Sequence, residues 1–212
     1  MLMGTGPARL SALLTLGIPL LIAQDPGLRL VAAARAQVGV TLGYDSRYAR
    51  IPYPGGDVPL DRGVCTDVLI RAYRAQGLDL QKLVHEDMGR AWEAYPRAWG
   101  LKAPDRNIDH RRVPNLATFF GRHGLSLPLS REAKAYLPGD IVTWRLTSGV
   151  PHTGLVSDRR SPAGHPLILH NIGEGVREED RLFAYTLTGH YRYPAPAPRS
   201  QAQAAPRASR AE

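Results

Sequence analysis

The stretch LPGDIVTWRLTSGVPHTGLVSD, residues 137–158, decides the fold of this chain. A Pro-Gly-Asp turn, which Asp140 is expected to brace through its own side chain, leads into a β-branched run at 141–143. The segment HTGLVSD follows at 152–158, and two further runs, PLILHNI and FAYTLTGHYRY, occupy 166–172 and 183–193. Turn residues separate these segments, so the C-terminal half predicts several strands, with a hairpin tip at 173–180.

The N-terminal half predicts helices. Residues 28–38 are rich in Ala and Leu, residues 65–76 carry apolar side chains at helical spacing, and residues 115–123 form a short helical pattern before Gly124. Residues 39–63 are dense in Gly and Pro and predict a loop, and residues 78–112 predict a loop with a short helix. Helices followed by strands indicate an α+β domain with an antiparallel sheet.

Composition limits the partners that we expect. The 212 residues carry 27 Lys and Arg against 19 Asp and Glu, a net charge of +8. The arginines are scattered without interleaved aromatic residues, so no nucleic-acid binding is expected, only mild attraction to an anionic surface. A single cysteine excludes an internal disulfide and a multi-thiolate metal site, and no His, Asp or Glu spacing resembles a zinc site. We expect no metal, no cofactor and a monomer.

The two ends of the chain differ from its middle. Residues 1–23 combine Arg9 with an apolar run from residue 10, which predicts an export signal or an uncleaved N-terminal anchor. Residues 194–212 are rich in Pro, Ala and Arg and predict a disordered tail. The expected domain therefore spans residues 24–193, and the expected location is the periplasm or cell envelope.

Cys65 begins the helix predicted at 65–76. In a first helical turn a thiol faces unpaired backbone N–H groups and the positive end of the helix dipole, which favour the thiolate. This position predicts a lowered pKa and a nucleophile. The alternative interpretation is a small buried hydrophobic residue, the commoner role of an isolated cysteine.

Two histidines favour the catalytic interpretation. His152 opens one predicted strand, where it is suited to act as the base for a nucleophilic cysteine, and His170 lies in the next, where it is suited to orient His152. Asn171 is the other candidate for the orienting role. Successive side chains in a strand point to opposite faces, so only one of His170 and Asn171 can serve.

The order of these segments resembles the NlpC-type cell-wall cysteine peptidases, a papain-like family. GVCTDVLIRAYR (63–74) stands where that family has D-C-S-G and an apolar helix, and LPGDIVTW, HTGLVSD and LILH match its L-x-P-G-D, H-V-G-I-Y and V-I-H-A strands. The resemblance covers residues 28–193, and more narrowly the chain resembles a bacterial family of unknown function near these peptidases. It implies a papain-like fold and hydrolysis of peptidoglycan amide bonds by Cys65, His152 and His170.

Other residues are candidates to support substrate or oxyanion. The family has a site tyrosine upstream, a place for which Tyr53 (YPGG) and Tyr44 (TLGY) compete, with Tyr53 favoured. Asp67 replaces a family Gly and joins Tyr53, Arg111 and Asn171 in this set. Arg111 is suited to a substrate carboxylate, although a solvated loop with an Asp–Arg pair explains it equally.

The sequence leaves three functions open. The main hypothesis is an exported cysteine peptidase or amidase that acts on peptidoglycan. A thiol-dependent acyltransferase of the same fold needs the same three residues. A catalytically inactive cell-wall-binding module needs the fold alone.

Overall fold

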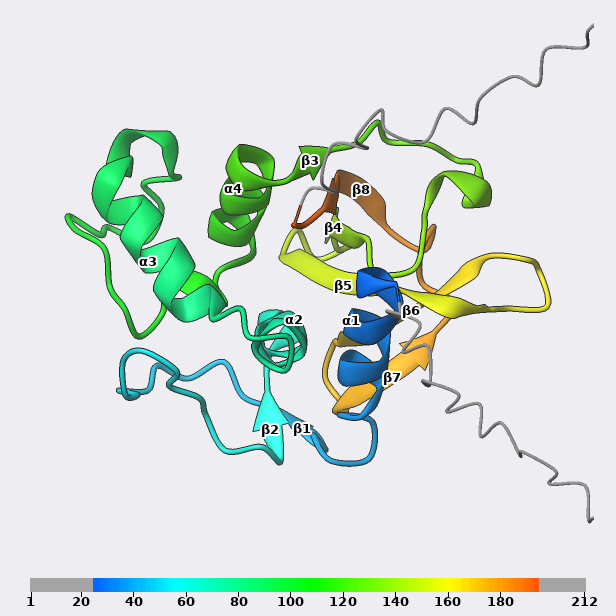
Figure 1. The fold of residues 1–212 in the computed structure, drawn as a ribbon, viewed down its shortest axis with the longest axis horizontal. Coiled ribbons are helices and arrows are strands. Elements are labelled where there is room, and N and C mark those ends of the chain that lie inside the picture. The colour runs from blue at the N-terminus through cyan, green and yellow to red at the C-terminus, as the bar shows by residue number, and fades with distance from the viewer. Residues whose placement is uncertain (1–24, 195–212) are drawn as a thin grey trace, which may run out of the picture.

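The structure of the protein, a computed structural model, describes residues 25–194 as helices packed on an antiparallel sheet (Figure 1). The helices are α1 (Pro26–Arg35), α2 (Cys65–Arg74), α3 (Leu80–Arg90) and α4 (Val113–His123), with 3-10 turns at Trp92–Ala94, Asp109–Arg111 and Ala133–Ala135. The strands are β1 (Gly43–Tyr44), β2 (Arg62–Gly63), β3 (Leu125–Ser126), β4 (Ile141–Arg145), β5 (Pro151–Arg160), β6 (Pro166–Asn171), β7 (Val176–Glu179) and β8 (Thr186–Arg192). The six-stranded sheet has the order β3-β8-β4-β5-β6-β7, and β1 pairs separately with β2. This architecture confirms the α+β prediction.

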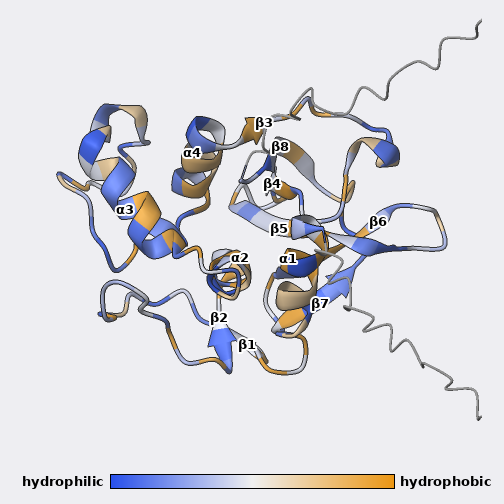
Figure 2. Ribbon diagram, viewed as in Figure 1, coloured by the Kyte–Doolittle hydropathy of each residue, from blue (hydrophilic) through white to orange (hydrophobic). Residues whose placement is uncertain are grey.

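Three elements differ from the sequence prediction. Residues 78–112 contain the 11-residue helix α3, whose first turn is capped by the side chain of Asp79. The expected hairpin tip contains β7, a mostly hydrophilic edge strand (Figure 2). Part of the expected 39–63 loop forms the short β1–β2 pair. The strands β1, β2 and β7 are too short or too polar for a hydrophobic period to reveal them, whereas α3 carries buried Leu80, Val84 and Met88 at helical spacing and is longer than the short helix expected there.

Two predictions concern parts of the chain that lie outside the described residues. The expected export segment, residues 1–23, lies outside them, as does the expected tail apart from Pro194. Within residues 25–194, none of the helices has the length and apolar character needed to span a membrane.

The sheet buries both of its faces. Ile141, Leu155 and Leu169 pack with α1, α2, α3 and α4 in the larger core, whereas their neighbours on the same strands, including Val142 and Val156, pack in a second cluster. The second cluster also contains Tyr136, Trp144, Ile168 and Leu182. Adjacent residues on a strand thus serve different layers, as strand alternation requires.

Asp140 joins the turn before β4 to β8, which is distant in the sequence but neighbours β4 in the sheet. Its fully buried carboxylate accepts hydrogen bonds from the backbone N–H of Leu137 at 2.9 Å, His190 Nε2 at 2.8 Å and Arg192 Nε at 2.6 Å. The first of these bonds is the expected bracing of the turn. Burial raises the pKa of this carboxyl, but the bonds from His190 and Arg192 outweigh burial and hold the pKa below its ordinary value.

We expect Asp140→Ala to lower the free energy of unfolding by about 3–5 kcal/mol at pH 7, because it leaves buried partners without their acceptor. The wild-type contribution is present above the ordinary aspartate pKa of about 3.9 and declines as the pH falls from there, so the difference narrows in acid. Urea denaturation at pH 7 and pH 3 measures both effects. Asp61→Ala, at an exposed ion pair with Arg62, is the control and should leave stability nearly unchanged. An equal cost at both pH values contradicts this account of Asp140.

Candidate active site

The helix α2 begins at Cys65 because the residues around it fix that position. Val64 is extended, with φ −113° and ψ 179°, and its backbone N–H donates to Asp67 Oδ2 at 2.7 Å. Asp67 thereby satisfies a donor that the helix itself leaves open. Cys65 is consequently the first residue of the helix, as the sequence predicted.

Asp67 and Arg111 form a buried bidentate ion pair. Arg111 Nε donates to Asp67 Oδ1 and Arg111 Nη2 to Asp67 Oδ2, both at 3.0 Å. The same guanidinium donates to the backbone oxygens of Asp45 at 3.1 Å and Arg47 at 3.4 Å. The structure therefore places Arg111 inside the protein as a brace between α2 and the loop after β1, neither in a solvated loop nor open toward a substrate.

Tyr44, and not the favoured Tyr53, lies beside the cysteine. Tyr44 pairs with Gly63, two residues before Cys65. Burial is the largest of the effects that raise the pKa of Tyr44 to about 12, and the electrostatic influence of Cys65 and Asp67 acts in the same direction. Tyr53 instead packs edge-on against His85, with ring centroids 5.3 Å apart. The structure thus places Tyr44, and not the favoured Tyr53, near Cys65. Two similar Tyr-Gly contexts cannot be ranked from sequence alone.

Cys65 is buried, with 4% of its surface exposed. Burial, together with the negative charge of Asp67, raises the pKa of its thiol to about 12. Hydrogen bonds from the backbone N–H groups of Thr153, Thr66 and Cys65 itself oppose this rise but do not overcome it. The helix-end effect expected from the sequence is therefore present, but the expected low pKa is wrong, and the resting cysteine is a neutral thiol at pH 7.

His152 and His170 lie in direct contact on neighbouring strands. His152 Nε2 and His170 Nδ1 are 2.9 Å apart, in a buried hydrogen bond. The indole of Trp144, opposite His152 in the β4–β5 pair, stacks on the His152 ring with centroids 5.8 Å apart. Burial lowers the pKa of His152 to about 3, helped by His170, so its imidazole is neutral at pH 7.

Gly154 allows this approach. A Cβ atom at residue 154 would lie 2.5 Å from Ile168 Cγ2 and 3.2 Å from His170 Cβ, and the first distance is too short for real side chains. The glycine of the H-T-G sequence thus lets β6 come close enough for the two histidines to meet.

Asn171 has a different partner from His170, as strand alternation predicted. Its Nδ2 donates to the backbone oxygens of Gly43 and Gly63, both at 3.1 Å. Asn171 therefore ties β6 to β1 and to the segment directly before Cys65. It positions the cysteine loop and makes no contact with His152 in the described residues.

The cysteine and histidine sides of the site meet at Thr153. Its backbone N–H contacts the Cys65 thiol, and it follows His152 on β5. No hydrogen bond links the thiol to the His152 ring, and His152 Nδ1 forms none with any residue in 25–194. The thiol of Cys65 thus lies at a helix N-terminus and contacts Thr153 of β5. The neutral imidazole of His152 belongs to the preceding residue of the same strand, and it is hydrogen-bonded to the imidazole of His170.

Sequence reasoning missed Glu179. It is the last residue of β7, and its Oε2 lies 3.2 Å from His170 Nε2. Its sequence context, GVREED, is acidic and contains only one large apolar residue, so no strand was expected there. Val176 is the only buried residue of β7 and is followed by three charged residues, which is too weak a signal to set the register of this strand.

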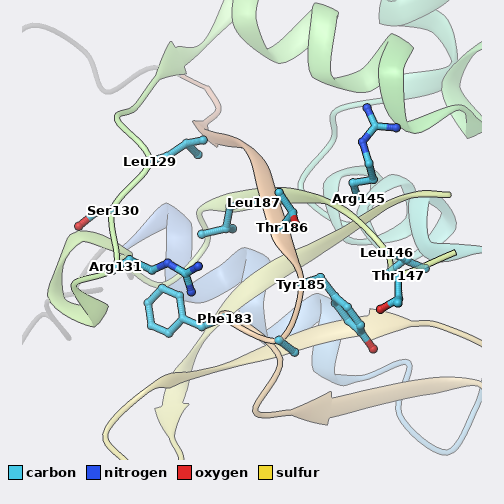
Figure 3. A pocket seen from close by; sticks show the side chains of 11 residues that line it. Leu129, Ser130, Arg131, Arg145, Leu146, Thr147, Phe183, Tyr185, Thr186 and Leu187 are labelled. Carbon is cyan, nitrogen blue, oxygen red and sulfur yellow. The ribbon is translucent and has the colours of Figure 1, made fainter. Parts of the chain in front are cut away.

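One hollow borders Tyr44, and a second is lined by none of the site residues described above. One, of about 530 Å³, is lined by Leu42–Arg47 together with Asp61 and Arg62, and so includes Tyr44. The other, of about 720 Å³, is lined by segments near residues 130, 146 and 185, with Arg131 beside Phe183 and Arg145 on the opposite side (Figure 3). Only the first shares a residue with the surroundings of Cys65. Within the described part of the chain, His, Cys, Asp and Glu form no cluster of three or more that suits a metal ion.

We expect Cys65 to react with iodoacetamide at pH 7 at least about 100-fold more slowly than an exposed thiol, because it is buried and protonated. Mass spectrometry of the alkylated chain over time measures the rate. In urea the rate should rise to that of a free cysteine. Alkylation as fast as that of an exposed thiol in the folded protein would restore the low pKa expected from sequence.

Comparison with known proteins places this site in a family. The chain is 55% identical over 172 residues to the uncharacterized protein YijF of Escherichia coli (strain K12), covering 81% of this chain and 84% of that protein. It is similar to the structure of NlpC1 from Trichomonas vaginalis, with a TM-score of 0.44 and 16% identity, over 82% of this chain and 46% of the other. The chain thus spans less than half of that structure. Residues 31–193 match the model of the family described as "Domain of unknown function (DUF1287)", and the chain belongs to this family.

Proposed function

We propose that this chain is an exported cysteine hydrolase that cleaves amide bonds in peptidoglycan stem peptides. Cys65 is the nucleophile, His152 the general base and acid, and His170 the group that orients His152. The observation that carries this proposal is the 2.9 Å hydrogen bond between His152 and His170, formed one residue from the N–H that contacts the cysteine sulfur. A base held by an orienting group is one part of the arrangement that nucleophilic catalysis requires.

The first half-reaction transfers a proton within the site. As the Cys65 sulfur attacks the amide carbonyl, the thiol proton moves to His152 Nδ1, the ring nitrogen that makes no hydrogen bond with a described residue. The backbone N–H of Cys65, at the N-terminus of α2, stabilises the oxyanion. His152 then gives the proton to the leaving amine, and the C–N bond breaks to leave an acyl group on sulfur.

The second half-reaction returns the enzyme to its resting state. His152 Nδ1 takes a proton from water, which attacks the thioester carbonyl. The carboxylic acid leaves, and the sulfur recovers its proton from His152. Water supplies the only additional atoms.

The hollow around Tyr44 suits the proposed substrate. Its walls carry charges of both signs: Asp45 pairs with Arg47, and Asp61 pairs with Arg62. Stem peptides carry both carboxylates and amines. A surface with paired charges offers each of these groups a partner.

The inactive cell-wall-binding module is the second candidate, and the burial of Cys65 favours it. A neutral thiol that is 4% exposed needs movement of its surroundings before a substrate can reach it. A space-filling cysteine needs no such movement. Cleavage assays separate the two functions.

We expect the chain to release peptide fragments from purified peptidoglycan, and mass spectrometry of the soluble products identifies the bond cleaved. Cys65→Ala should reduce the rate by roughly 10³-fold or more, because it removes the nucleophile. Binding of both proteins to insoluble peptidoglycan without any cleavage supports the inactive module. Products in which another amine replaces water identify an acyltransferase.

His170→Ala and Asn171→Ala should have different effects. We expect His170→Ala to lower kcat by about 10- to 10⁴-fold, because His152 loses the partner that orients it. Asn171→Ala should cost far less kcat but lower the melting temperature, since the oxygens of Gly43 and Gly63 lose their donor. A larger loss of kcat for Asn171→Ala would give the orienting role to Asn171.

A further inference from the structure

We propose that Glu179 is a positioning residue of this site: its carboxylate fixes the protons of His170 and His152 on Nε2 and leaves His152 Nδ1 free as the base. The inference rests on the proposed function for its catalytic meaning. Its structural part concerns only the tautomers of two imidazoles, which are neutral because burial lowers the pKa of both His152 and His170 below the ordinary value. It stands on the contacts between β5, β6 and β7.

The strand register brings Glu179 to His170. Glu179 pairs with Ile168 across β6 and β7, and residues 168 and 170 share one face of β6. Glu179 is therefore the diagonal neighbour of His170, within reach of a long side chain. Its Oε2 lies 3.2 Å from His170 Nε2.

The contacts of Glu179 keep it an acceptor. Arg181 Nε donates to the same Oε2 at 3.3 Å, so this oxygen acts as a hydrogen-bond acceptor. The side chain is 29% exposed at the wall of a cavity of about 320 Å³, which also includes Arg177. An ionised carboxylate accepts hydrogen bonds and donates none.

The tautomers follow from this one fact. A neutral imidazole has one N–H and one lone pair, so the bond to Glu179 puts the His170 proton on Nε2 and the lone pair on Nδ1. His152 Nε2, 2.9 Å from that lone pair, must then be a donor. The remaining nitrogen of His152, Nδ1, carries a lone pair and can accept the thiol proton.

The opposite arrangement is inactive. With its proton on Nδ1, His170 would donate to His152 and turn a lone pair toward the Glu179 carboxylate. His152 would then hold its proton on Nδ1, so the nitrogen that makes no hydrogen bond with a described residue would have no lone pair to accept the thiol proton of Cys65. Glu179 thus acts through two imidazoles on a reaction that it does not touch.

Nitrogen-15 NMR of histidine-labelled full chain at pH 7 reads these tautomers directly, with His152 and His170 assigned by single substitutions. We expect both rings to be protonated on Nε2 in the wild type. Glu179→Leu should produce a mixture in which His170 and His152 are partly protonated on Nδ1. It should also lower kcat by about 10- to 100-fold, since the base is correctly protonated only part of the time.

Two variants separate positioning from folding. Glu179→Gln keeps an acceptor oxygen and should retain most of the wild-type tautomers and rate, even if Glu179→Leu folds poorly. Glu174→Gln removes a neighbouring carboxylate that pairs only with Arg177 and should change neither. A His170 proton on Nδ1 in the wild type overturns the proposal, as do unchanged tautomers in Glu179→Leu. Tautomers that respond as expected in a chain that cleaves no peptidoglycan contradict the proposed hydrolysis and leave the role of Glu179 in place.

Discussion

The buried pair of Asp67 and Arg111 determines where α2 begins, and the candidate site depends on that position. Asp67 receives the backbone N–H of Val64, while Arg111 holds the loop after β1 and accepts a bond from Thr66 Oγ1 through its own carbonyl. Buried ion pairs are costly to form and more costly to break singly, because the partner is left charged without compensation. This pair therefore makes any shift of Cys65 along the helix unfavourable.

The same pair has a chemical cost at the nucleophile. The carboxylate of Asp67 lies close enough to Cys65 to disfavour a second negative charge, and it adds to the effect of burial on the thiol pKa. His152 is neutral for a related reason, since burial disfavours its imidazolium. Both partners thus rest uncharged, and an ion pair between them forms only if a bound substrate changes their surroundings.

The sequence was sufficient for features that follow from local pattern. The Pro-Gly-Asp turn, the start of α2 at Cys65 and the strands that carry His152 and His170 all have a period or a turn signature, and the structure places each of them as predicted. Strand alternation also separated His170 from Asn171. The fold class followed because helices precede strands.

Features that depend on long-range contacts were not predictable. The pKa of Cys65 depends on its burial under other elements. The structural role of Arg111 depends on Asp67, a partner 44 residues away. The position of Tyr44 near Cys65 depends on the two-residue pairing of β1 with β2. Glu179 needs the register of an edge strand whose composition predicts a loop. In each case the deciding quantity is a distance across the fold, which a single sequence does not contain.

The edge position of β7 explains why a carboxylate can serve a buried pair of histidines. A fully buried glutamate would pay a large desolvation cost and tend to be protonated, and it would then no longer be an obligatory acceptor. At the sheet edge Glu179 keeps contact with solvent and with Arg181, while His170 and His152 remain 1% and 3% exposed. The series from Arg181 through Glu179 and His170 to His152 thus runs from solvent to the interior, and the charges lie at its outer end. The inner imidazole remains neutral, which is the state a base requires.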